Sequence, residues 1–419
     1  MDLPSSLSRD ISPPRAIKRR RKLETLSAVP LTEPDHSADE DPTLAAVEAG
    51  RAKIEDHLTY FKRHLSKASR STTPDVPKLS IVDFASLYKN NEHQHGHHFV
   101  IHQHNHPRAG VHYDLRLQFS ATSSVSWALP KGLPGNPNSR QLGRMAIETR
   151  VHNLWNNLIE SASLKTGSLL IWDTGTYSVL PRKKDTKEIP SPQTTDAESD
   201  AEESMASGYR NGMHENEKLI EAFKSRHIRL RLHGTRLPKD YTITLRLPSN
   251  NDAYKKPVAR RRKSKPAARS RRPSHASDSD PDTAPTLLTD PQRTSTAKTA
   301  TTLNIDIDVE DPDLDTDTDE DALTRSQNAY PGSHNTIGSA HQRRWFLLLD
   351  RERSGFESAR GKWTRRLLPS GELGGFEPFV VRGRDVERSV VTGRLARDVE
   401  RDEGCEGYVG RGGWKSIED

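Results

Sequence analysis

The sequence predicts an all-β fold, a barrel or a sandwich, with a few peripheral helices and long disordered insertions. Many short segments alternate apolar and polar side chains and are separated by proline or glycine turn signals, a pattern typical of antiparallel sheets. Only 32% of the 419 residues are hydrophobic and 6% are aromatic, with a mean hydropathy of -0.84. Because so few apolar side chains are available, much of the chain is expected to lie outside the packed core.

Segment 99–117 carries the strongest chemical signal, and it predicts a β-hairpin with a turn at 107–110. Three histidines precede the turn at intervals of two residues: His102, His104 and His106. Three polar residues follow the turn and alternate with apolar ones: His112, Asp114 and Arg116. Successive strand side chains point to opposite faces, so the second set would share one face.

These residue types indicate phosphoester chemistry at a metal. Imidazole nitrogens with one carboxylate suit a divalent transition metal such as zinc or manganese, and a neighbouring arginine suits a phosphate. The plainer interpretation is a set of polar surface side chains with modest ion pairs. The concentration of several such residues on one predicted face favours the metal site.

Other segments complete the predicted sheet, and three are predicted to be helical. The remaining strand candidates are 124–133, 145–151, 168–173, 177–180, 227–232, 241–247, 345–349 and 376–381. We interpret 168–180 as a hairpin that turns at Gly175, and strand 145–151 delivers His152 at its end. The helical candidates are packing elements at 42–66, 219–223 and 385–400.

Composition divides the chain into one interrupted domain and several variable regions. We expect a mostly disordered basic N-terminal region at 1–75, a charged disordered insertion at 182–214 and a disordered basic then acidic linker at 250–324. The barrel would comprise 79–181 and 215–249. Region 325–419 would supply a closing strand and a helix-containing C-terminal part.

The charge distribution favours a polyanionic partner and a nuclear address. Net charge is +6 and the pI is near 9.2. Two basic clusters contain Lys18, Arg19, Arg20, Arg21 and Lys22, and Arg260, Arg261, Arg262 and Lys263. Such clusters are bound by a nuclear import receptor or a nucleic-acid backbone, although a solvated charged tail is the simpler alternative. We therefore expect nuclear localisation.

The single cysteine and the absence of long apolar runs exclude several protein classes. Cys405 alone can form neither an internal disulfide nor a cysteine-based zinc site, and it suits a reducing compartment. No run of 18 apolar residues occurs and the N-terminus lacks an apolar signal core. We expect neither membrane insertion nor secretion.

Four blocks of the sequence, in this order, resemble the 3′-phosphoesterase domain of DNA ligase D. They are 99–117, which ends in His-Tyr-Asp-Leu-Arg-Leu; 126–132, Ser-Trp-Ala-Leu-Pro-Lys-Gly; 171–177, Ile-Trp-Asp-Thr-Gly-Thr-Tyr; and 230–237, Leu-Arg-Leu-His-Gly-Thr-Arg-Leu. The resemblance covers roughly 95–250 without the charged insertion. It implies a compact β-barrel that uses manganese to heal DNA or RNA-containing 3′ ends, by removing a 3′-phosphate or a terminal ribonucleoside.

The resemblance also implies a role for each site residue. His112 and Asp114 would ligate the metal together with an upstream histidine, which matches His104 by its distance from Phe99. Arg116 and His152 would bind the phosphate and act in catalysis with His112 and Asp114. Mn²⁺ would be the cofactor, and Zn²⁺ or Co²⁺ would also suit these ligands.

The sequence departs from the family in three places. The interval from His104 to His112 is two residues longer than the family's, so His102 or His106 could serve instead of His104. Asn156 stands where the family has a tyrosine, and the segment 161–167 is shortened. The last two changes concern the substrate side of the pocket and bear on the ribonuclease step.

The function predicted from these residues is a nuclear, metal-dependent 3′-phosphoesterase in DNA repair, working with a repair ligase or polymerase in trans. The alternative is a catalytically weak DNA-end-binding scaffold of the same fold, which Asn156 and the shortened segment favour. A third possibility is a metal phosphoesterase for small nucleotides, which would show little salt dependence.

Overall fold

The computed structural model describes residues 42–44, 47, 52–181, 212–248, 324–405 and 408–417. Both basic clusters and most of the two predicted insertions lie outside these ranges. No helix in the described ranges is long and apolar enough to cross a membrane.

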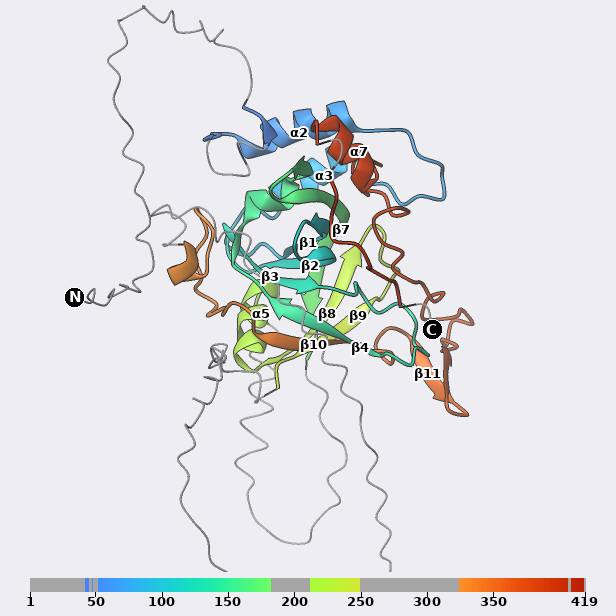
Figure 1. Cartoon of the computed structure of the whole chain (residues 1–419). Helices are drawn as coiled ribbons and strands as arrows, with labels where there is room; N and C mark the ends of the chain where they lie inside the picture. Colours follow the sequence, from blue (N-terminus) through green and yellow to red (C-terminus); the bar gives the residue numbers. More distant parts are fainter. Residues whose placement is uncertain are drawn as a thin grey trace, which may run out of the picture. The chain divides into compact units, whose positions relative to one another are not determined.

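Eight antiparallel strands close into a barrel, which confirms the predicted all-β fold (Figure 1). Their order around the barrel is β1, β2, β3, β4, β10, β9, β8 and β7, and β7 pairs with β1 to close it. The strands are β1 (His98–His106), β2 (Gly110–Gln118), β3 (Ser123–Leu129), β4 (Gly143–Glu148), β7 (Gly167–Val179), β8 (His227–Gly234), β9 (Thr242–Arg246) and β10 (Arg344–Leu349). The short strands β5 (His152–Asn153) and β6 (Ser161–Ser163) pair with β3 and β7, and β11 (Phe356–Ala359) and β12 (Lys362–Arg365) form a separate hairpin.

Alternation along the strands fills the barrel with apolar side chains. Tyr113 of β2, Trp127 of β3 and Trp345 of β10 are all buried in one core. Strand β10 lies between β4 and β9, so the chain that follows the long linker completes the barrel. This pairing is the closing role predicted for 345–349.

A second apolar cluster lies outside the barrel, under the helices. It joins Phe61 of α2 (His57–Ala68), Phe84 of α3 (Ile81–Lys89), Leu158 of the 3-10 helix η1 (Leu154–Leu158) and Ile171 of β7. Figure 1 shows α2 and α3 together on one side of the barrel and α7 (Ala396–Asp402) beside β7. Helix α5 (Glu215–Lys224) packs on β8.

Two of the predicted helices differ from the apolar pattern. In 42–66, Leu44 and Val47 are helical, but the helix is interrupted before α2. Within the described part of 42–66, residues 52–56 are not helical, because Asp56 caps α2 by accepting a 2.9 Å hydrogen bond from the Thr59 amide. Likewise α7 begins at Ala396 and not at 385. Gly393 just before it adopts φ +74°, a left-handed turn conformation that ends the preceding loop.

Segment 376–381 is not a strand, contrary to its apolar appearance. Phe376 packs edge-on against Phe356 and also contacts Tyr241, and Phe379 donates one backbone hydrogen bond to Gly135. The segment therefore packs its aromatic side chains against the barrel and does not pair as a strand.

The hairpin predicted at 168–180 is wrong, because β7 runs without a turn from Gly167 to Val179. Gly175 pairs with Phe99 on one side and with Gly234 on the other. A Cβ at Gly175 would lie 1.9 Å from the His233 carbonyl oxygen, so this glycine permits close strand approach and does not mark a turn.

Candidate metal centre

The β1–β2 register gathers the polar residues on one face. His104 lies opposite His112, and His102 lies opposite Asp114. The residues that alternate with them along the strands, such as Ile101 and Tyr113, belong to the barrel core. The histidines and the aspartate therefore lie on the other face of the two strands, outside the apolar interior.

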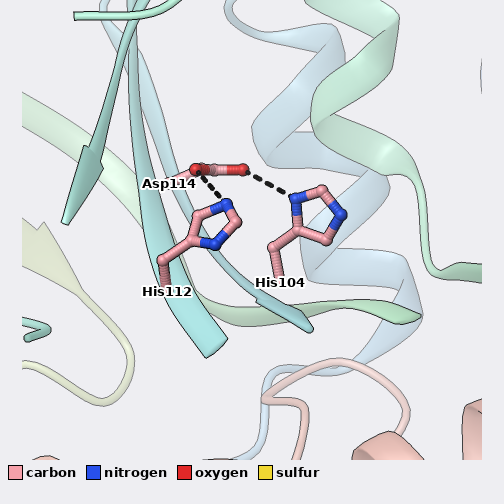
Figure 2. Close-up of side chains that lie close together, drawn as sticks. All are labelled: His104, His112 and Asp114. Carbon is pink, nitrogen blue, oxygen red and sulfur yellow. Dashed lines mark ion pairs between the residues drawn. The ribbon is translucent and has the colours of Figure 1, made fainter. Parts of the chain in front are cut away.

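His104, His112 and Asp114 form a possible metal site (Figure 2). Asp114 lies between the two rings: His104 Nδ1 is 3.5 Å from one carboxylate oxygen and His112 Nε2 is 3.4 Å from the other. The candidate ligand atoms all lie within 4.8 Å of one another. Two imidazole nitrogens and one carboxylate at this spacing fit a divalent transition metal.

Backbone carbonyls fix which ring nitrogens face Asp114. His104 Nε2 is 2.9 Å from the Thr166 carbonyl, and His112 Nδ1 is 3.0 Å from the Gly110 carbonyl. Carbonyl oxygens only accept, so both of these nitrogens carry the proton. The opposite nitrogens, His104 Nδ1 and His112 Nε2, are left with lone pairs toward the carboxylate, as in metal sites whose histidines are oriented by a second hydrogen bond.

The charges of the cluster agree with this assignment. Burial lowers the pKa of His112 below its usual value, which favours the neutral ring that a metal requires. Burial by itself would raise the pKa of Asp114, but the charges of its neighbours, which include the Arg116 guanidinium, outweigh burial and hold that pKa well below its usual range. Asp114 is therefore ionised at neutral pH.

Arg116 extends the cluster along β2. Its Nη2 is 3.8 Å from Asp114 Oδ2, and its Nη1 donates a 3.1 Å hydrogen bond to the Asn156 carbonyl in η1. The side chain is 6% exposed. The Asn156 side chain takes no part in this bond, since its backbone carbonyl accepts it.

His152 lies beyond Arg116, on the short strand β5. It pairs with Ser124 of β3, and its Nδ1 donates a 2.9 Å hydrogen bond to the Arg150 carbonyl. Burial, followed by the positive charge of Arg116, holds the pKa of His152 well below its usual value. The structure thus brings His152 within electrostatic range of Arg116 and Asp114.

The other two candidate ligands are not part of the metal cluster. His106 Nδ1 accepts hydrogen bonds from the Arg108 and Ala109 amides at 3.2 and 3.0 Å, so it stabilises the hairpin turn. His102 is fully buried, and neither of its ring nitrogens has a hydrogen-bond partner. Of the three alternatives, His104 is the one whose nitrogen faces Asp114.

Asp173, in the third of the four sequence blocks, helps to hold the barrel together. Asp173 accepts hydrogen bonds from the backbone amides of Thr174, Thr235, Arg236 and Leu237 at 2.8–2.9 Å. It thereby ties β7 to the turn that follows β8. Its place in a sequence block is explained by this structural role.

Sequence reasoning missed the groups that orient the site. The Thr166 carbonyl belongs to segment 161–167, so that segment positions a candidate metal ligand. Tyr330 comes from the chain beyond the long linker, and its ring lies 4.7 Å from the His152 ring. A backbone carbonyl carries no sequence signal, and Tyr330 reaches this position because 328–330 pairs with Val151 through backbone hydrogen bonds.

Comparison with known families agrees with the fold and the cluster. Residues 102–245 match the family described as DNA Ligase D 3'-phosphoesterase domain. Over these residues the barrel is similar to a DNA ligase D 3′-phosphoesterase domain. This finding confirms the resemblance seen in the four sequence blocks, and the matched range includes His104, His112 and Asp114.

Two relatives show how far the similarity extends. The chain is 34% identical over 130 residues to the multifunctional non-homologous end joining DNA repair protein LigD of Mycobacterium tuberculosis and to LigD of Mycobacterium bovis. The match covers 30% of this chain and 15% of each relative. Strand β10 and the described residues 324–417 lie outside the family match.

Proposed function

We propose that this chain is a metal-dependent 3′-phosphoesterase that removes a 3′-phosphate or a terminal ribonucleoside from DNA or RNA-containing DNA ends during repair. The observation that carries the proposal is the oriented cluster of His104, His112 and Asp114 within a domain of a phosphoesterase family. The relatives are named for non-homologous end joining, which suggests broken DNA ends as the substrate.

His104 Nδ1, His112 Nε2 and an Asp114 oxygen would hold the metal, which we propose to be Mn²⁺, with Zn²⁺ or Co²⁺ as alternatives. When bound, such an ion polarises phosphoryl oxygens and lowers the pKa of water. The carbonyls of Thr166 and Gly110 keep both rings in the tautomer that binds. Their rigidity means that little reorganisation is needed at the site.

Arg116 and His152 would bind the phosphoryl group beside the metal. A guanidinium offers several donors in one plane, which suits the oxygens of a phosphate. The Nδ1 of His152 is held by the Arg150 carbonyl, so its Nε2 is the atom available to the substrate or to a proton. Both side chains would stabilise the negative charge that grows in the transition state.

The test is release of phosphate from an oligonucleotide with a 3′-phosphate, with added Mn²⁺ and the full chain. Arg116→Lys keeps the charge but removes the planar fork, so we expect turnover to fall by at least about 10²-fold. Lys62→Ala on the exposed side of α2 serves as a control and should keep the wild-type rate. Full activity of Arg116→Lys would contradict the phosphate-binding role.

A catalytically weak end-binding scaffold is the second candidate. The observation that favours it is the hydrogen bond that commits one Arg116 amino group to the Asn156 carbonyl. A scaffold would bind 3′ ends equally well with EDTA present and release neither phosphate nor nucleoside. Measured release that depends on added metal would eliminate it.

We also propose that the protein acts in the nucleus, where a repair ligase or polymerase would seal the healed end in trans. The two basic clusters, 18–22 and 260–263, support an import signal. A fluorescent fusion of the full chain should be nuclear and should lose that distribution when both clusters are replaced by alanine. Unchanged nuclear distribution in that variant would contradict the proposal.

A further inference from the structure

A cavity of about 550 Å³ lies at the end of the β1–β2 hairpin, on the opposite side of the strands from the metal cluster. Asn105 and Val111 line it, and they are the chain neighbours of His104 and His112. Successive strand residues point to opposite faces, so the cavity and the metal cluster lie on opposite faces of the hairpin. The rest of the wall comes from 382–385 and 410–416, beyond the family match.

The wall of this cationic cavity is strongly positive. Four cations line it, namely Arg382, Arg384, Arg411 and Lys415, against a single carboxylate, Asp385, so the net formal charge is +3. Glu400 pairs with Arg384 at 2.8 Å and neutralises it. Within the described chain the other three cations form no ion pair, and all three are exposed. A concave surface of one sign concentrates ligands of the opposite sign.

The cavity also offers an anchored aromatic ring and bare backbone. Trp414 lines the wall, and its Nε1 donates a 2.8 Å hydrogen bond to the Pro130 carbonyl. A Cβ at Gly383 would lie 2.6 Å from the indole, so the ring is packed closely against the chain. At Gly412 and Gly413 an added Cβ would meet no atom within 4 Å, so the backbone of the wall is open there. Cations combined with an aromatic ring are the features with which proteins bind single-stranded nucleic acid.

The C-terminal segment 408–417 is held by the β1–β2 hairpin and by the loop that follows β3. The Tyr408 hydroxyl donates a 2.8 Å hydrogen bond to the Asn105 carbonyl, and Arg411 donates to the Arg108 carbonyl at 3.4 Å. On the far side Lys131 donates to the Lys415 carbonyl at 3.3 Å. These contacts give the cavity a defined wall in the folded chain.

We propose that the cationic cavity binds the single-stranded segment of a nucleic acid whose 3′ end lies at the metal cluster. Arg382, Arg411 and Lys415 contact its phosphodiester backbone, and Trp414 contacts a base. The identity of the strand rests on the proposed function, but the binding itself needs neither metal nor turnover. The C-terminal segment therefore adds a strand-binding surface to the phosphoesterase domain.

The test is fluorescence anisotropy with the full chain, a labelled oligonucleotide with a single-stranded 3′ tail, and EDTA in the buffer. The variant Arg382→Ala/Arg411→Ala/Lys415→Ala removes three phosphate contacts. The slope of log affinity against log salt should therefore fall in magnitude by about 2, at roughly 0.7 per contact. Its affinity at low salt should fall at least about tenfold.

The matched control is Lys224→Ala/Lys239→Ala/Lys362→Ala, which removes three exposed positive charges elsewhere. It should keep the wild-type slope, and a tail without bases should bind the wild type more weakly. Wild-type affinity and slope in the cavity variant would overturn the proposal, as would equal binding of a blunt duplex. Because EDTA is present, these results are independent of whether the chain releases phosphate.

Discussion

Replacing Glu160 by glutamine should destabilise the protein by about 3 kcal/mol, because it leaves the buried guanidinium of Arg394 without its main counter-ion. Glu160 is 1% exposed, and it accepts hydrogen bonds from Arg394 Nη2 at 3.1 Å and from Thr392 Oγ1 at 2.6 Å. It also accepts from the Ser389 hydroxyl and the Ile171 amide. An amide has one acceptor oxygen and cannot satisfy all four donors.

The magnitude follows from the burial of this pair. Breaking a buried ion pair by removing one partner costs about 3–5 kcal/mol. The lower end applies here because Arg394 Nη1 keeps Asp402 at 3.2 Å. At about 2–4 °C per kcal/mol for a domain of this size, the midpoint of thermal unfolding should fall by about 6–12 °C.

Thermal unfolding of the full chain, followed by tryptophan fluorescence, measures this change. Glu377→Gln is the matched control, since Glu377 pairs with Arg365 but its side chain is 82% exposed, and its midpoint should move by less than about 2 °C. The double variant Glu160→Gln/Arg394→Met should recover part of the loss, because it removes both buried charges. A midpoint for Glu160→Gln within about 2 °C of wild type would refute the reasoning.

Three other changes test separate parts of the structure. Added Mn²⁺ at about a hundred times its dissociation constant should stabilise the wild type by about 2.7 kcal/mol. The variant Asp114→Asn should show no metal-dependent rise in its melting midpoint. An equal rise in both proteins would place the ion elsewhere. Burial lowers the pKa of His98 to about 3, so its protonation is disfavoured in the folded state. The free energy of unfolding should then fall as pH drops from about 6.5 toward 3, by up to about 1.4 kcal/mol per pH unit. The variant His98→Gln should flatten this pH dependence in urea titrations. An unchanged slope would assign the loss of stability to other groups. Gly234→Ala should cost about 1–3 kcal/mol in the same titrations, since its Cβ would lie 2.1 Å from an oxygen of Asp173, and a neutral result would contradict the packing.

The metal cluster was predictable because a strand repeats every two residues. Once a turn is placed at 107–110, the polar residues of both arms must share one face, and His104 must lie near His112. The choice among the three upstream histidines needed more than spacing. It depended on the Thr166 carbonyl, which holds His104, and on the turn amides, which engage His106.

The elements that sequence reasoning misplaced are those fixed by distant contacts. Gly175 looked like a turn because its close approach to the His233 carbonyl is invisible in the sequence. The C-terminal region looked helical from 385, whereas buried pairs such as Glu160 with Arg394 hold 389–394 as a loop on the barrel. Tertiary hydrogen bonds and ion pairs decided these conformations against local propensity.

The central claim is a metal-dependent phosphoesterase whose metal lies between His104, His112 and Asp114. The most direct test is phosphate release from a 3′-phosphate end by the wild type and His112→Ala, each with added Mn²⁺ and with EDTA, alongside circular dichroism to verify folding. We expect release by the wild type with Mn²⁺ alone and none by folded His112→Ala. Equal release by both proteins, or release that persists in EDTA, would contradict the account.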